Sequence, residues 1–104
     1  MIEYNITISL DDNIELEWLE WMKSHHIPKV INCGVFKGAK IKKILTKEEI
    51  TYAVSYICDN MDKINEYQRR YAPSLQSEYI ERYGTSTVVF RTLLEVVDDI
   101  KADL

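Results

Sequence analysis

Residues 2–10, IEYNITISL, alternate between apolar and polar side chains without interruption. In an extended chain, successive side chains point to opposite faces, so the five apolar residues of this stretch share one face. They are Ile2, Tyr4, Ile6, Ile8 and Leu10. Alternation of this length predicts a β-strand with one buried face, and the other elements are assigned by working outward from it.

The segment after this strand has the apolar spacing of a helix. Apolar residues recur at helical intervals from Ile14 to Met22, and His25 continues the same stripe. Pro28 disfavours α geometry at the residue before it, so the helix is expected to end by His26 or Ile27. A short further turn over 29–33 should then be closed by Gly34.

The second half of the chain predicts a hairpin, a broken helix and a last strand. Residues 50–58, ITYAVSYIC, are rich in β-branched and aromatic residues, and a charged turn joins them to an expected strand over 35–45. Asn60 and Asp59 should cap a helix that restarts at Pro73 and stops at Gly84, because proline inside a helix costs about 3 kcal/mol. The last strand is expected over 85–97.

The order β-α-β-β-α-β predicts an α+β domain of ferredoxin-like topology. Two right-handed crossovers around a hairpin give a four-stranded antiparallel sheet with both helices on one face. The 104 residues fit one such domain, with a polar tail over 98–104. The small-residue row of 50–58, which contains Thr51, Ala53, Ser55 and Ile57, is expected under the helices.

One face of this sheet would be left uncovered. Strands 50–58 and 85–97 carry large apolar side chains on both faces, so the uncovered face is expected to be apolar. An exposed apolar sheet is a partner surface, and two sheets packed face to face would make a homodimer. The positions flanking Arg91, Val89 and Leu93, are expected on this uncovered face.

Composition limits the other partners and the compartment. The net charge of −4 argues against a nucleic-acid partner, and the cluster of Lys37, Lys40, Lys42, Lys43 and Lys47 is typical of a protected strand edge. No signal peptide or membrane-spanning stretch is predicted. Two separated cysteines and two histidines give no disulfide framework, metal site or cofactor motif. A soluble, cytoplasmic protein without a cofactor is expected.

Five residues make up the candidate site. His26 could act as a general base or a polar anchor, since the end of a helix favours a protonated imidazole, although capping or packing is the favoured explanation. If a pocket exists, we expect Tyr4, Trp21, His26, Tyr56 and Arg91 to line it, between the sheet and the end of the first helix. Arg91 and Glu95 share an apolar strand face, so they could form an interface pair, or Arg91 could bind an anionic ligand.

Several ordered segments also resemble a known family. The segments are Tyr4-Asn5-Ile6-Thr7, Trp18-Leu19-Glu20-Trp21-Met22, His26-Ile27-Pro28-Lys29-Val30, Gly34-Val35-Phe36, residues 51–56, Tyr71-Ala72-Pro73-Ser74-Leu75, and Phe90-Arg91-Thr92 with Glu95. Together they resemble the DUF4286 family, bacterial proteins of unknown function related to the dimeric α/β-barrel superfamily. The resemblance implies a fold and a homodimer. Its other branches include cofactor-free monooxygenases, haem-degrading enzymes and isomerase-like proteins, whose reactions do not follow from topology.

Three hypotheses for function follow. The first is a non-enzymatic homodimer that binds a small ligand or a protein partner. The second is a cofactor-independent enzyme, resembling a monooxygenase or isomerase, that acts on a small apolar or aromatic substrate with His26 as base. The third is a structural component of an assembly. A polar-lined cavity beside His26 would favour the enzyme, and a filled interior would favour the structural role.

Overall fold

Four strands form one antiparallel sheet in the order β2-β3-β1-β4. The computed structural model describes residues 1–103, and Leu104, the last residue of the expected tail, lies outside them. The strands are β1 (Ile2–Leu10), β2 (Gly38–Ile44), β3 (Ile50–Cys58) and β4 (Thr87–Glu95). Strand β1 pairs with β3 on one side and with β4 on the other over its whole length. The predicted ferredoxin-like α+β fold is confirmed.

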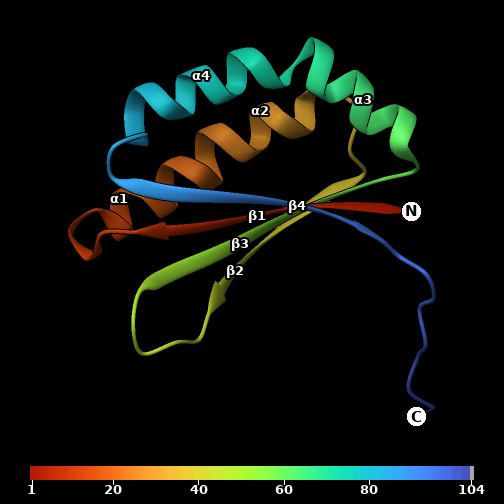
Figure 1. Cartoon of the computed structure of the whole chain (residues 1–104), viewed down its shortest axis with the longest axis horizontal. Helices are drawn as coiled ribbons and strands as arrows, with labels where there is room; N and C mark the ends of the chain where they lie inside the picture. Colours follow the sequence, from red (N-terminus) through yellow and green to blue (C-terminus); the bar gives the residue numbers. More distant parts are fainter. Residues whose placement is uncertain (104) are drawn as a thin grey trace.

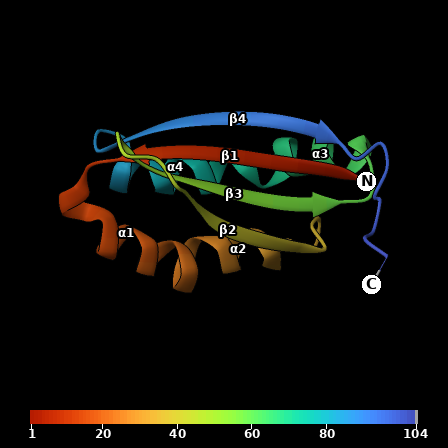
Figure 2. The same ribbon diagram turned by 90° about the horizontal axis from the view of Figure 1, so that it is seen from below.

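All the helices cover one face of this sheet (Figure 1). A 3₁₀ turn, η1 (Asp12–Ile14), leads into α1 (Glu15–Trp21), a π-helical segment η2 (Met22–His26) and α2 (Ile27–Asn32). Helices α3 (Met61–Arg70) and α4 (Ala72–Tyr83) form the second crossover. Seen from below, the strands lie in front and the opposite face is uncovered (Figure 2). No helix within residues 1–103 is long and apolar enough to cross a membrane.

The sequence predicted that the first helix would end before Pro28, but in the structure the helical backbone continues past it. The backbone stays helical from Glu15 to Asn32 through η2, in which the N–H of Ile27 donates to the carbonyl of Met22 five residues earlier. Pro28 then occupies the first turn of α2, where its missing N–H matters least. His26 therefore lies inside a continuous helical segment rather than at a helix C-terminus.

The second proline behaves as predicted. Helix α3 starts at its cap, where the Asn60 side chain accepts a hydrogen bond of 3.1 Å from the N–H of Lys63. It ends at Arg70, Tyr71 adopts a φ of −119°, and α4 begins with Pro73 in its first turn. The second crossover therefore consists of two helices, α3 and α4, joined at Tyr71.

For the small-residue row of β3 and for the positions flanking Arg91 on β4, the faces are the reverse of those predicted. Register places Tyr56 opposite Tyr4 and Arg91 opposite Ile6, so these side chains all face the helices. The large residues of β3 are buried there, and its small-residue row lies on the uncovered face. Val89 and Leu93 likewise lie on the helix side, next to Ile8 and Tyr4 in register, and the predicted dimer positions were wrong. Both rows of β4 are apolar, so alternation alone could not decide between them.

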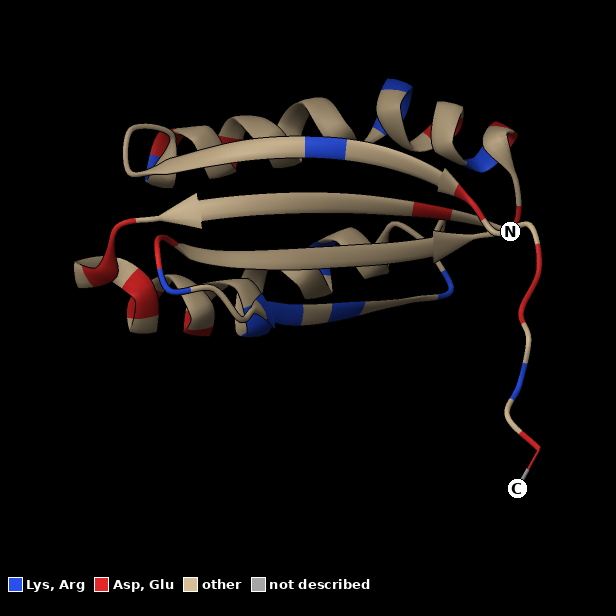
Figure 3. Cartoon of the chain, turned by 60° about the horizontal axis from the view of Figure 1, so that its bottom comes forward, with Lys and Arg blue, Asp and Glu red and all other residues tan. Residues whose placement is uncertain are grey.

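The uncovered face is also more polar than predicted. Its centre holds a hydrogen-bonded chain in which Lys42 Nζ donates to Ser55 Oγ at 3.0 Å and Ser55 Oγ donates to Asn5 Oδ1 at 2.9 Å. Basic residues gather along the edge strand β2 (Figure 3), as the lysine cluster predicted. Apolar exposure on this face is concentrated on β4, where Val88 and Phe90 are each 70% exposed.

Residues 35 and 36 belong to the core rather than to the second strand. The predicted strand began at Val35, but β2 begins at Gly38, and Val35 and Phe36 are buried in the loop before it. The Phe36 ring lies 5.1 Å from that of Tyr56 and 4.9 Å from that of Tyr67. This loop therefore closes one end of the space between sheet and helices.

The turn after α2 gives the first testable prediction. Gly34 has a φ of +83°, and its N–H donates to the carbonyl of Ile31 at 3.1 Å. A side chain is strained in this left-handed conformation, so Gly34→Ala should lower the free energy of unfolding by about 1–2 kcal/mol. Urea denaturation measures the change. Gly38→Ala is the matched control, because an added Cβ there meets nothing within 4 Å; equal losses from both variants would contradict the assignment.

Candidate functional site

A small cavity lies between the middle of the sheet and the helical layer. Its floor comes from all of the strands except β2, and consists of Tyr4, Ile6, Ile8, Tyr56, Val89 and Arg91. Met22, His26 and Val30, spaced four residues apart through η2 and α2, form one wall. The other wall comes from α3 and α4 and consists of Tyr67, Leu75, Gln76 and Tyr79. The volume of about 30 Å³ has room for one or two water molecules.

His26 lines this cavity and has an unpartnered ring nitrogen. Its side chain is buried, and no residue in 1–103 provides a hydrogen-bond partner for Nδ1. The ring stacks on Trp21 at 5.3 Å and meets the edge of Tyr79 at 5.6 Å. Burial lowers the pKa of His26 to about 4, against a smaller opposing effect of the Glu78 carboxylate. The imidazole is therefore neutral near pH 7, contrary to the protonated form expected at a helix end.

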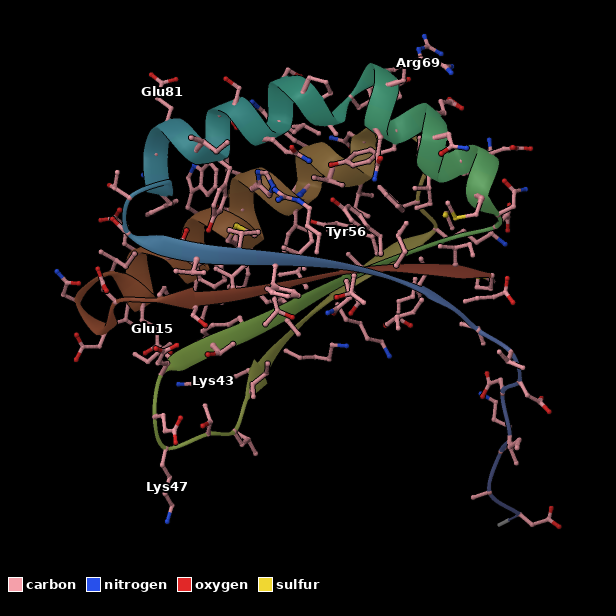
Figure 4. The ribbon with its side chains drawn as sticks, viewed as in Figure 1. Glu15, Lys43, Lys47, Tyr56, Arg69 and Glu81 are labelled. Carbon is pink, nitrogen blue, oxygen red and sulfur yellow. The ribbon has the colours of Figure 1, made fainter. Side chains whose placement is uncertain are left out.

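Tyr56 presents the second unpartnered group. Its side chain rises from the sheet toward the helices (Figure 4) and is 1% exposed, and its hydroxyl has no hydrogen-bond partner within the described chain. The ring lies 6.4 Å from that of Tyr4 and 5.1 Å from that of Phe36, and these two rings in turn lie 6.0 and 4.9 Å from that of Tyr67. Burial raises the pKa of Tyr56 and of Tyr67, so both phenols stay protonated and can donate a hydrogen bond.

Arg91 brings the only charge to the lining. It is the single basic residue of β4 and lies opposite Ile6, with its backbone at the edge of the sheet. It makes no ion pair with any carboxylate in residues 1–103. Its charge offsets part of the rise that burial causes in the pKa of Tyr4, Tyr67 and Tyr79. The guanidinium therefore lies near three phenols, and no carboxylate in residues 1–103 forms an ion pair with it.

Four of the five predicted site residues thus surround one cavity, and Trp21 does not line it. Trp21 lies behind His26, where its ring stacks on His25 at 5.2 Å and lies 5.3 Å from the guanidinium of Arg82. Its position fixes the His26 ring rather than contacting the cavity. Glu95, the predicted partner of Arg91, lies opposite Ile2, outside the cavity lining, and forms no ion pair with Arg91.

On the outer side of the helices, an ion-pair cluster holds the two walls together. Glu78 of α4 accepts from His25 Nε2 at 3.0 Å and from Lys29 Nζ at 3.0 Å. These contacts lower the pKa of the Glu78 carboxyl, with Lys29 as the larger cause. Tyr83 donates to Glu17 at 3.0 Å, and Trp18 Nε1 donates to Tyr79 at 3.0 Å. Polar bonds therefore fix α4 against α1 and α2.

The sequence analysis missed the wall formed by α3 and α4. Tyr67, Leu75, Gln76 and Tyr79 were not among the five predicted site residues, although a helix face that packs over a sheet also faces any cavity between them. Gln76 had the clearest signal, since it is a polar residue beside the apolar stripe of Leu75 and Tyr79. The described residues contain no group of three His, Cys, Asp or Glu side chains placed to hold a metal.

Comparison with known proteins identifies the family. The model of a domain of unknown function, DUF4286, matches residues 1–97. The chain belongs to the DUF4286 family. No protein with a curated description matches it at the level of sequence. The family assignment agrees with the resemblance seen in the ordered segments, and it provides a fold without an activity.

Solved structures related to this DUF4286 protein share its fold at low sequence identity. A dimeric ferredoxin-like protein from an uncultured marine organism has a TM-score of 0.72 and 13% identity, over 97% of this chain and 98% of that one. The haem degrader MhuD from Mycobacterium tuberculosis, with two haems in its active site, has a TM-score of 0.72 and 16% identity, over 97% and 100%. An ethyl tert-butyl ether degradation (EthD) family protein from Bacillus halodurans has a TM-score of 0.69 and 12% identity, over 93% and 100%.

Burial of His26 predicts a pH dependence of stability. The folded-state pKa of about 4 lies below the usual value of 6.5, so between these values the unfolded chain binds a proton that the folded chain does not. Stability should therefore fall as the pH drops from about 6.5 to 4, by up to about 3 kcal/mol.

Urea denaturation at several pH values measures this loss. The neutral variant His26→Gln should lose much less stability across the same interval. His25→Gln is the control, since the His25 side chain is 41% exposed and lies outside the cavity lining, and it should keep the wild-type slope. A wild-type slope in His26→Gln would show that other groups cause the loss.

Proposed function

We propose that this DUF4286 protein binds a small, mainly apolar ligand in the cavity between its sheet and helices. The observation that carries the proposal is a pair of buried, unpartnered polar atoms, His26 Nδ1 and the Tyr56 hydroxyl, on one cavity. Leaving such a group unsatisfied costs about 1–3 kcal/mol. A ligand with a matching polar group would recover that cost, while its apolar part would contact the surrounding aliphatic and aromatic side chains.

A ligand larger than water requires the cavity to open. Helix α4 supplies Leu75, Gln76 and Tyr79 to one wall, and it is joined to α3 only through the non-helical Tyr71. Movement of α4 about Tyr71 would widen the cavity without disturbing the sheet. The bonds of Glu78 to His25 and Lys29 oppose this movement from outside.

Cofactor-independent catalysis with His26 as base is the second candidate. It is favoured by the position of the free Nδ1 on the cavity. However, a general base works best when its pKa lies near the working pH, and the pKa of His26 is about 4. A neutral imidazole of this kind is better suited to hydrogen bonding with a ligand. The cavity also favours binding over a purely structural role, for which a filled interior was expected.

Replacing the Tyr56 hydroxyl tests the central observation. Tyr56→Phe removes an unpartnered polar group, so the free energy of unfolding should stay unchanged or rise by about 1 kcal/mol. Tyr79→Phe is the matched control, because its hydroxyl contacts Trp18 and Thr87 at 3.0 Å each, and it should lose about 1–2 kcal/mol. Chemical denaturation measures both changes.

Native mass spectrometry of freshly purified protein completes the test. We expect a retained small molecule in the wild type and less of it in Tyr56→Phe. If Tyr56→Phe and Tyr79→Phe lower the free energy of unfolding equally, the Tyr56 hydroxyl has a structural partner, and the proposal loses its main support. A wild-type mass without any bound molecule, even under the gentlest conditions, would also count against it.

We further propose that two copies associate through the uncovered faces of their sheets. Support comes from the exposed apolar row on β4, Val88, Phe90 and Leu94, and from structural relatives that are described as dimeric. A row of this kind on an edge strand is a partner surface when nothing in its own chain covers it. The polar centre of the face restricts the apolar contact to the β4 side.

A charge in this row should disrupt the dimer. Phe90→Glu places a carboxylate where an apolar contact is expected, so light scattering at micromolar concentration should report a monomer. Ile80→Glu is the control, because Ile80 is 62% exposed on α4, away from the sheet, and should leave the dimer intact. A wild-type protein that is already monomeric at these concentrations would exclude this interface.

A further inference from the structure

The electrostatics of the cavity favour an anionic ligand. Arg91 is the only charged side chain in the lining, and no carboxylate in residues 1–103 pairs with it. The chain as a whole carries a net charge of −4, so its overall charge does not account for this local positive site. Arg91 is itself exposed, but it also lines a largely apolar cavity, and an anion bound against it inside that cavity would be screened less than one in open solvent.

The neighbours of Arg91 are suited to the same anion. Its charge acts on the phenols of Tyr4 and Tyr67, which burial keeps protonated. A protonated phenol can donate a hydrogen bond to an anionic oxygen. Arginine binds a carboxylate through two parallel N–H donors, which fixes the plane of the carboxylate as well as its position.

Once α4 moves and the cavity widens beyond its volume of about 30 Å³, its lining would suit a flat apolar body with a second polar group. The rings of Tyr4, Tyr56, Tyr67 and Tyr79 contribute to the lining, together with aliphatic side chains such as Ile6 and Val30. Aromatic side chains favour offset or edge contacts with another ring. The unpartnered His26 Nδ1 and Tyr56 hydroxyl are additional polar groups that a carboxylate bound at Arg91 would leave for another substituent.

We propose that the cavity selects a small aromatic carboxylate with a polar ring substituent. The carboxylate binds Arg91, the ring lies among the tyrosines, and the substituent hydrogen-bonds to His26 and Tyr56. This inference rests on the proposed ligand-binding function and narrows it to one chemical class. It involves binding only, and no covalent step is included.

Calorimetric titration with three probes tests the class. The probes are 4-hydroxybenzoate, its neutral methyl ester and 4-hydroxyphenyl phosphate, which all carry the same ring hydroxyl. We expect 4-hydroxybenzoate to bind at least about tenfold more tightly than the ester, since a hydrogen bond to a charged group contributes about 1.5–3 kcal/mol. Because 4-hydroxyphenyl phosphate keeps the ring hydroxyl and changes only the anion, it separates a carboxylate site from a general anion site, and it should bind more weakly than 4-hydroxybenzoate.

Matched arginine variants identify the residue responsible. Arg91→Gln should lower the affinity for 4-hydroxybenzoate about tenfold and change that of the ester less than twofold. Arg70→Gln is the control, because Arg70 lies on α3, outside the cavity lining, and contacts Glu66 at 4.0 Å. It should leave both affinities unchanged. Circular dichroism of each variant confirms that it is folded.

The inference is overturned if the ester binds as tightly as the acid, if 4-hydroxyphenyl phosphate binds best, or if Arg91→Gln weakens acid and ester equally. Failure of all three probes to bind would also overturn it. None of these results decides the broader proposal, because native mass spectrometry detects a retained molecule of any class. If the retained molecule is neutral, the proposal of ligand binding remains supported, and the proposal that the ligand is a carboxylate is rejected.

Discussion

The pairing of β1 with strands on both of its sides is the constraint on which the rest of the structure depends. Its register places Tyr56 beside Tyr4 and Arg91 beside Ile6, so residues 35 positions apart in the sequence meet over one strand. A shift of one residue would turn every side chain to the opposite face. Arg91 and Tyr56 would then lie on the uncovered face, and the cavity would lose its charge and one of its unpartnered polar atoms.

The helical wall depends on a second local constraint, the accommodation of Pro28. Proline cannot donate to the preceding turn and crowds its carbonyl, and the widened π segment just before it lets the helix continue. Met22 and His26 are the first and last residues of that segment, and both face the cavity. Such π segments occur often at functional sites. Pro28 was expected to end the helix, but the π segment that accommodates it instead places His26 above the sheet.

The sequence was sufficient for the elements whose pattern has a single solution. Strands β1 and β3 and the restart at Pro73 were predicted correctly, because strict alternation, β-branched composition and a proline each exclude alternatives. The faces of β3 and β4 were not, because both rows of each strand contain apolar residues and only packing against the helices distinguishes them. The protonation of His26 was wrong for a related reason, since burial depends on tertiary contacts that helix position does not reveal.

The cavity also has to be reconciled with the stability of a small domain. A chain of 104 residues has a small core, so two unsatisfied polar groups in that core are a considerable cost. Adjacent contacts compensate for this cost, since the Tyr79 hydroxyl hydrogen-bonds to both Trp18 and Thr87 just beyond the cavity. The Glu78 contacts with His25 and Lys29 are partly exposed and contribute less each. The strong bonds therefore hold the Tyr79 end of α4, whereas its other end, at Tyr71 and Leu75, has fewer polar contacts with α1 and α2. Entry of a ligand is consequently expected beside Leu75 and Gln76, where opening breaks the fewest buried hydrogen bonds.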